Sequence, residues 1–120
     1  AGEYFEIEEG REGQYRHMLF VTQVRERYRE LLTSITHVDG SARVQVVEQE
    51  SAPRFHALIR RFGDDHGTPV LLNTSFNLRG QPIVRTPLEA VATYARSTID
   101  ALAIGDWLVV REPAAGGSDD

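Results

Sequence analysis

The sequence predicts a single domain of the α/β (α+β) class, in which helices pack on a sheet. Its 120 residues are enough for one core without disulfides, and a hydrophobic content of 41% with 26% charged residues is typical of a globular chain. A clear helical repeat in the middle of the chain is flanked by short segments rich in β-forming residues. This alternation of helices and short strands is the pattern that indicates the fold class.

The first half of the sequence carries mostly extended segments. Residues 4–7 are a candidate short strand, and residues 17–24 are nearly continuous in apolar character, as expected of a strand buried in a sheet. The charged residues 25–34 are compatible with a short helix or an exposed loop. A turn signal, Asp39-Gly40, precedes residues 42–47, which are expected to form the next strand.

Residues 51–63 carry the clearest helical pattern. Ser51 and Pro53 mark its start, and Gly63 is expected to stop it. One face is expected to be buried, because apolar side chains recur at helical spacing. They are Phe55, Leu58, Ile59 and Phe62.

The second half of the sequence predicts one more helix and a hairpin. Residues 68–72 are expected to form a short buried strand that leads into a polar loop over 73–81. Thr86, Pro87 and Glu89 then form a capping box with proline at the first helical position. The apolar stripe expected for this helix is Leu88, Val91, Ala92 and Ala95. Residues 102–104 and 107–110, separated by Gly105-Asp106, are expected to form a closing hairpin or two strand pieces, followed by a flexible tail over 113–120.

Composition excludes several classes of function. The formal charge of −5 argues against a nucleic-acid-binding surface. All 13 basic residues are arginine, so a side-chain cation that holds a phosphate must be a guanidinium, although GC-rich coding is the simpler explanation of an all-arginine chain. There is no cysteine, which removes disulfides and thiolate sites. No apolar run is long enough to cross a membrane, and a cytoplasmic protein is expected.

A polar segment follows the expected strand at residues 68–72. The residues at 73–77 are Asn-Thr-Ser-Phe-Asn, with two amides and two hydroxyls at a point where a sheet edge presents backbone N–H groups to a ligand. The same segment is compatible with an Asx- or Ser/Thr-capped turn that Gly80 closes. Composition alone leaves both interpretations open.

A second polar cluster surrounds Gly40. His37 is a candidate to act on a proton or to donate a hydrogen bond, and Arg43 is a candidate to clamp a phosphate that Ser41 and the Gly40 backbone would line. A lone histidine more often makes a structural hydrogen bond, and the Asp39-Gly40 pair is usually only a turn.

Gln45 shares the strand face of Arg43, which is either a pocket wall or the solvated face of an edge strand. The other histidines, His17, His56 and His66, have no partner at metal-ligand spacing and are expected at the surface or at helix ends. Nucleophile-elbow, Walker and Gly-x-Gly-x-x-Gly signatures are absent from the sequence.

Taken together, these segments resemble the C-terminal domain of the NodU/CmcH-type carbamoyltransferases. The resemblance extends over most of the chain, to residue 111, and rests on the order and spacing of its motifs. They are Tyr4-Phe5, Met18-Leu19-Phe20-Val21, the segments 37–45 and 71–77, Gly80-Gln81-Pro82-Ile83-Val84 and Thr86-Pro87.

The resemblance implies a two-domain enzyme, in which an actin-like ATPase-fold domain is followed by a YrdC-like domain with a twisted mixed sheet. It implies that the YrdC-like part converts carbamoyl phosphate and ATP, with Mg²⁺, to carbamoyl adenylate, whose carbamoyl group passes to a hydroxyl of an antibiotic or nodulation factor. Carried over residue by residue, it implies contacts from Arg43, Asn73 and Ser75 to carbamoyl phosphate, and pocket positions for His37, Gln45 and Asn77. Carbamoyl phosphate is a dianion with an amide head, so a guanidinium, hydroxyls and amides are suitable partners.

The resemblance implies that residues 1–112 are this C-terminal domain without its upstream segment, because the chain starts after the family's Gly-Pro-Arg-rich segment and Lys/Arg-bearing stretch and contains no lysine. The chain is expected to be either a shortened form of that domain or a stand-alone relative that has lost half of the active site. The isolated chain is expected to be inactive and to need the N-terminal domain as its partner. An open sheet edge favours a homodimer. The alternative is a non-catalytic binding or oligomerisation module that keeps only the fold, whereas a role on tRNA is disfavoured by the acidic charge.

Overall fold

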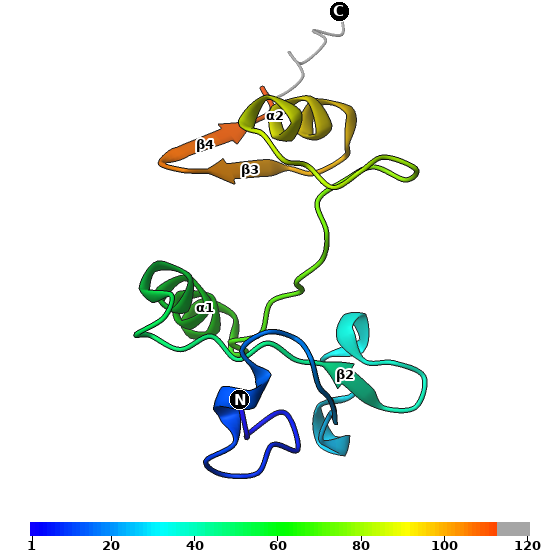
Figure 1. The fold of residues 1–120 in the computed structure, drawn as a ribbon, viewed down its shortest axis with the longest axis vertical. Helices are drawn as coiled ribbons and strands as arrows, with labels where there is room; N and C mark the ends of the chain where they lie inside the picture. The colour runs from blue at the N-terminus through cyan, green and yellow to red at the C-terminus, as the bar shows by residue number, and fades with distance from the viewer. Residues whose placement is uncertain (113–120) are drawn as a thin grey trace, which may run out of the picture. The chain divides into compact units, whose positions relative to one another are not determined.

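A computed structural model describes residues 1–112 of the chain as two compact units, one formed by residues 1–72 and one that begins at Asn73 (Figure 1). The expected flexible tail at 113–120 lies outside the described residues. Each unit contains a helix and an antiparallel pair of strands, so the α+β class is confirmed. The described strands form two separate two-stranded sheets and not a single mixed sheet.

The first unit contains three 3₁₀ helices, two strands and one α-helix. The charged segment 25–34, left open between helix and loop, contains one 3₁₀ helix and the start of another. In chain order the elements are η1 (Glu12–Tyr15), β1 (Val21–Gln23), η2 (Glu26–Tyr28), η3 (Thr33–Ile35), β2 (Ser41–Arg43) and α1 (Pro53–His66).

Strand β1 is shorter and more exposed than the sequence predicted. Met18 adopts a left-handed backbone with φ 55°, which bends the chain and prevents the strand from extending back to His17. Leu19 and Phe20 are exposed, and only Val24, which follows β1, is fully buried. Because β1 has only three residues with which β2 can pair, β2 is limited to Ser41–Arg43. The sequence had predicted a strand over residues 42–47.

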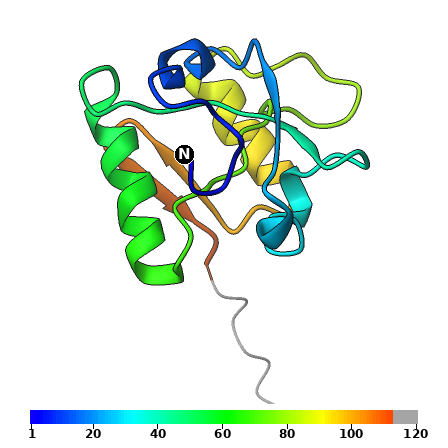
Figure 2. The same ribbon diagram turned by 90° about the horizontal axis from the view of Figure 1, so that it is seen from below.

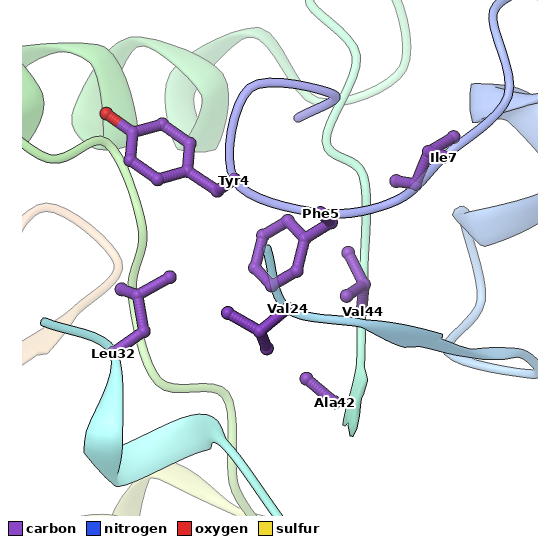
Figure 3. Packing of buried hydrophobic residues seen from close by; sticks show 7 residues of the cluster. All are labelled: Tyr4, Phe5, Ile7, Val24, Leu32, Ala42 and Val44. Carbon is purple, nitrogen blue, oxygen red and sulfur yellow. The ribbon is translucent and has the colours of Figure 1, made fainter. Parts of the chain in front are cut away.

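The core of the first unit forms around the N-terminal segment. Phe5 makes an antiparallel bridge with Val24, and the backbone N–H of Glu6 donates to the Gln23 carbonyl at 2.9 Å. Figure 3 shows the Phe5 ring beside Val24 at the centre of this cluster. The candidate strand at 4–7 is thus reduced to one bridge, yet it supplies much of the core. The buried cluster consists of Tyr4, Phe5, Ile7, Val24, Leu32, Ala42 and Val44.

Helix α1 is longer than predicted and is seen along its length in Figure 2. Gly63 does not end it; the helix continues to His66 and stops at Gly67, which takes φ 80° and donates its N–H to the Gly63 carbonyl. Gly63 instead allows close packing, because a Cβ there would lie 2.7 Å from Pro69 Cβ. The expectation of a buried face was wrong: no residue of α1 is buried, since the unit's core forms elsewhere.

Residues 68–72 do not form the buried strand that was predicted. Pro69 has no N–H to donate, and the N–H of Val70 turns back to the Thr68 carbonyl at 2.9 Å. Val70 packs against the core cluster, while Leu72 is 62% exposed. The segment is therefore an irregular connection along the first unit.

The second unit begins its helix α2 (Pro87–Arg96) as the sequence predicted. Thr86 Oγ1 accepts from the Glu89 N–H at 3.2 Å, and Pro87 takes the first helical position. The Glu89 carboxylate accepts from the backbone N–H of Arg85, one residue before the cap. That hydrogen bond is the main reason why the pKa of the Glu89 carboxyl lies below its usual value.

The buried face of α2 differs from the predicted stripe. Ala90, Thr93 and Tyr94 are buried, whereas Leu88 and Val91 are exposed. Tyr94 fixes this orientation, because its ring lies under the Arg111 guanidinium at 4.9 Å and its hydroxyl donates to the Asp100 carbonyl. The same Arg111 donates to the carbonyls of Tyr94 and Ser97, which closes the end of the helix.

The predicted hairpin is confirmed as β3 (Ala101–Ile104) and β4 (Trp107–Val110), with α2 beside β3 (Figure 1). Gly105 takes φ 58°, as the first central residue of a two-residue hairpin turn requires. Neither α-helix of the described chain is long and apolar enough to cross a membrane.

Candidate functional site

The loop from His37 to Ser41 is closed by paired backbone hydrogen bonds. The His37 N–H donates to the Ser41 carbonyl at 2.7 Å, and the Gly40 N–H donates to the His37 carbonyl at 2.9 Å. Gly40 has φ 80°, and a Cβ there would lie 2.7 Å from Cζ of Arg29. The loop therefore favours glycine at this position because of its left-handed backbone, and a side chain there would also displace the Arg29 guanidinium.

Three side chains in this loop form a hydrogen-bonded chain. Asp39 Oδ1 accepts from the Ser41 hydroxyl at 2.6 Å and from the Ser41 backbone N–H at 3.0 Å. His37 Nδ1 lies 2.9 Å from the same Ser41 Oγ. The two hydrogen bonds from Ser41 lower the pKa of the Asp39 carboxyl, the hydroxyl contributing more than the backbone. Asp39, which the sequence indicated only as a turn residue, is thus the centre of the loop's polar network.

Arg43 lies at the end of β2 and points away from the core. Its neighbours Ala42 and Val44 are buried at 1% and 7% exposure, while Arg43 and Gln45 are exposed, as the predicted alternation requires. Within the described part of the first unit, no carboxylate pairs with the Arg43 guanidinium. Arg43 is therefore available to an oxyanion, which a guanidinium binds in bidentate fashion.

The other candidates of the first unit are already engaged. Gln45 Nε2 donates to the Arg16 carbonyl at 3.2 Å, so part of its amide is used within the unit. The backbone N–H groups of Gly40 and Ser41 are both consumed by the loop itself. The first unit thus brings together His37, Ser41 and Arg43 with Gly40 and Gln45 around one strand, with the guanidinium as the open donor.

The polar segment of the second unit contains the turn closed by Gly80, which was one of the two interpretations of this segment. Leu78 and Gln81 close a turn in which Gly80 takes φ 81°, and the Asn77 side chain donates to both of their carbonyls at 3.2 and 3.1 Å. Asn77 therefore caps this turn. Ser75 is exposed just before it, on irregular backbone.

Asn73 and Ser75 occupy the start of the second unit, and both are exposed. Their backbone does not follow a strand, because residues 68–72 are irregular. Within residues 1–112, no group of three or more His, Asp or Glu side chains lies together as a metal site would require.

One residue of the site would have been found from sequence alone by its local chemistry. In an Asx turn, the side chain of an aspartate accepts a hydrogen bond from the backbone N–H two residues later. The Asp39-Gly40-Ser41 sequence has this spacing. This spacing predicts the Asp39–Ser41 contact. The position of Arg29 over Gly40 has no comparable local signal, because it depends on tertiary packing.

Comparison with known proteins yields one family over nearly the whole chain. The family described as "Carbamoyltransferase C-terminus" matches residues 1–111. The nodulation protein NolO of Bradyrhizobium diazoefficiens is 40% identical over 115 residues, which cover 96% of this chain and 21% of that protein. NolNO of Sinorhizobium fredii is 39% identical, over 96% of this chain and 17% of that protein.

A relative with an enzymatic name gives a similar match. The 3'-hydroxymethylcephem-O-carbamoyltransferase of Streptomyces clavuligerus is 37% identical over 90 residues, which cover 75% of this chain and 17% of that enzyme. The chain thus spans about a fifth of the length of these relatives.

Proposed function

Because the chain belongs to the carbamoyltransferase C-terminal family, we propose that it is part of an ATP-dependent O-carbamoyltransferase that acts in the cytoplasm. In this proposal the chain contributes contacts to carbamoyl phosphate and ATP, and the product is carbamoyl adenylate. Carbamoyl phosphate, ATP and water yield carbamoyl adenylate, phosphate and pyrophosphate. A hydroxyl of a natural-product acceptor then takes the carbamoyl group, gives up its proton and releases AMP.

One observation supports the proposal above all others: the Arg43 guanidinium is exposed at the end of β2, without a carboxylate partner in the described part of the first unit. A guanidinium in this state binds a phosphate group through two parallel N–H donors. By the family resemblance, Ser75 and Asn73 of the second unit are proposed as further contacts for carbamoyl phosphate, through a hydroxyl and an amide. Mg²⁺ would arrive with the ATP phosphates, and no residue of the chain is assigned to hold it.

The names of the relatives support the type of acceptor. The relative from Streptomyces clavuligerus is named as an O-carbamoyltransferase of 3'-hydroxymethylcephem, and NolO and NolNO are named as nodulation proteins. A hydroxyl of a specialised metabolite is the acceptor class that we propose for the enzyme to which this chain belongs.

Calorimetric titration of the chain with carbamoyl phosphate tests the proposal. Arg43→Ala should weaken binding by about ten-fold or more, since a hydrogen bond to a charged group contributes about 1.5–3 kcal/mol. Ser75→Ala should weaken binding less, because it removes a neutral donor. Arg60→Ala, which removes an exposed arginine of α1, is the matched control and should bind as the unchanged chain does.

A second measurement separates binding from turnover. The chain alone, supplied with carbamoyl phosphate, ATP and Mg²⁺, is expected to release no pyrophosphate, because the proposed reaction uses the larger enzyme. Steady pyrophosphate release by this chain would show that the region matched here is sufficient for the first step.

The alternative, a non-catalytic binding or oligomerisation module, has its own support. Asn77 and the Gly40 and Ser41 N–H groups satisfy their hydrogen bonds inside their own turns, as purely structural residues would. No heat of binding from a folded sample would favour this alternative. A homodimer is proposed with it, because strands β3 and β4 form a sheet of only two strands. A monomer mass in light scattering would refute the dimer.

A further inference from the structure

We infer that His37 is held as its Nδ1–H tautomer by Ser41 and Asp39, and that its Nε2 is a hydrogen-bond acceptor for the amino group of carbamoyl phosphate. The tautomer follows from the geometry of the loop alone. The ligand rests on the proposed function. The two parts are therefore tested by separate measurements.

The tautomer follows from counting protons on Ser41. Its hydroxyl carries one proton, and Asp39 Oδ1, 2.6 Å away, has none to give when the carboxyl is ionised. The hydroxyl therefore donates to Asp39 and can only accept from its other neighbour. That neighbour is His37 Nδ1 at 2.9 Å, so Nδ1 carries the proton.

This arrangement leaves Nε2 as the acceptor of a neutral imidazole. His37 is exposed, while Ser41, which holds it, is only 4% exposed. No described residue of the first unit forms a hydrogen bond with Nε2. The buried hydroxyl thus anchors one side of the ring, and the other side is open to a ligand.

Strand geometry puts Ser41, which holds His37, on the same side of β2 as Arg43. Ser41 and Arg43 are two residues apart on β2, so their side chains leave the same face of the strand with Cα atoms about 6–7 Å apart. His37 is attached to this face through Ser41. One small ligand can therefore meet a guanidinium at one end and an imidazole at the other.

The chemistry of the two groups selects the orientation of the ligand. A guanidinium has only donors and suits phosphate oxygens. A neutral Nε2 has a lone pair and no proton, so it suits an amino donor and not a phosphate oxygen. Carbamoyl phosphate carries both ends, whereas acetyl phosphate has a methyl group in place of the amino group. His37 therefore discriminates between the two.

Nitrogen-15 NMR of the imidazole rings tests the tautomer without any ligand. In alkaline buffer, where imidazole is neutral, the Nδ1 of His37 should have the chemical shift of a protonated nitrogen and Nε2 that of an unprotonated one. His17, which has no such hydroxyl partner among the described residues, serves as the internal reference and should show the tautomer usual for free histidine. A proton on Nε2 of His37 would overturn the inference.

Three variants show whether Ser41 and Asp39 act as positioning residues. Ser41→Ala and Asp39→Ala should shift His37 toward the tautomer of His17. Asp39→Asn should keep the Nδ1–H form, because its Oδ1 can still accept from Ser41. The methyl signals of the fully buried Val24 report whether each variant is folded. An unchanged tautomer in folded Ser41→Ala would refute the role of Ser41.

Competitive titration with carbamoyl phosphate and acetyl phosphate tests the ligand. The unchanged chain should bind carbamoyl phosphate about five-fold or more tightly, as expected for one extra hydrogen bond of about 1 kcal/mol. His37→Phe should bind both alike. Equal affinities for the two compounds in the unchanged chain would refute the inference that His37 Nε2 accepts a hydrogen bond from the amino group. They would not affect the inference about the tautomer. If neither compound binds, the proposed function fails, and the tautomer still stands or falls by its NMR signals.

Discussion

Asp39 accepts two hydrogen bonds from Ser41 through one carboxylate oxygen, at 2.6 Å from the hydroxyl and 3.0 Å from the backbone N–H. This contact joins the turn after η3 to the first residue of β2. It also fixes the ring of His37, through the same hydroxyl. The loop that carries the candidate site is therefore organised by the carboxylate of Asp39.

The first prediction concerns the effect of low pH on the loop from His37 to Ser41. The pKa of Asp39 in the folded chain lies below its ordinary value of 3.8, chiefly because of the Ser41 hydroxyl. A depressed pKa means that Asp39 stabilises the folded loop above the unfolded value, and that this contribution is lost as the pH falls through the lower folded value. The Ser41 amide signal should therefore shift in NMR below about pH 4.

The control for this titration is Asp39→Asn, which keeps the acceptor but cannot titrate. Its Ser41 amide should show no transition in the same pH range. A transition of equal size in both proteins would mean that another acid controls the loop.

The second prediction concerns the packing of Gly63. Replacing glycine by alanine inside a helix normally stabilises it by about 1 kcal/mol. At Gly63 the added Cβ would lie 2.7 Å from Pro69 Cβ, so Gly63→Ala should lower the free energy of unfolding by about 1–3 kcal/mol. Urea unfolding measures the change.

Gly67→Ala separates packing from backbone strain. Nothing lies within 4 Å of a Cβ at Gly67, but its φ of 80° disfavours any side chain. Its expected cost is about 1 kcal/mol, from the left-handed conformation alone. If Gly63→Ala stabilised the chain, the close approach of α1 to Pro69 would be wrong.

The third prediction concerns the start of α2. Thr86→Ala removes the acceptor for the Glu89 N–H and should cost about 1 kcal/mol in the second unit. Thr86→Ser keeps the oxygen and should cost little. Hydrogen exchange of the amides in the first turn of α2 measures the effect locally. Equal exchange in the two variants would show that the cap contributes nothing.

Local signals in the sequence predicted the parts of the fold that depend on neighbours in the chain. The cap at Thr86 and the hairpin turn at Gly105 are short-range features, and the structure has both. The alternation that exposes Arg43 between buried Ala42 and Val44 was likewise readable, because strand periodicity is local.

Features that depend on distant residues were not predictable in this way. The core role of Tyr4 and Phe5 comes from pairing with the chain around Val24, far along the sequence. Gly63 was predicted to end the helix, but glycine is needed at this position because the helix packs closely against Pro69. Met18 shortens β1 through a left-handed backbone that no residue-type preference would suggest for methionine.

The candidate site likewise has features that the residue types predicted and features that only tertiary contacts reveal. Residue types alone indicated Arg43 as an anion ligand and His37 as either a structural or a chemical group. Only the side-chain contacts show that Ser41 links His37 to Asp39 and that Asn77 is used by its own turn. The roles of Asn73 and Ser75 remain predictions from the resemblance.

The central claim is that Arg43 binds the phosphate of carbamoyl phosphate, and the Nε–Hε signal of Arg43 in nitrogen-15 NMR tests it most directly. Arg43→Lys, which removes that signal, gives its assignment, and Arg60 serves as the reference in the same spectrum. We predict a saturable shift of the Arg43 signal during titration, with the Arg60 signal unchanged. An unmoved Arg43 signal, or equal unsaturated shifts at both arginines, would contradict the claim.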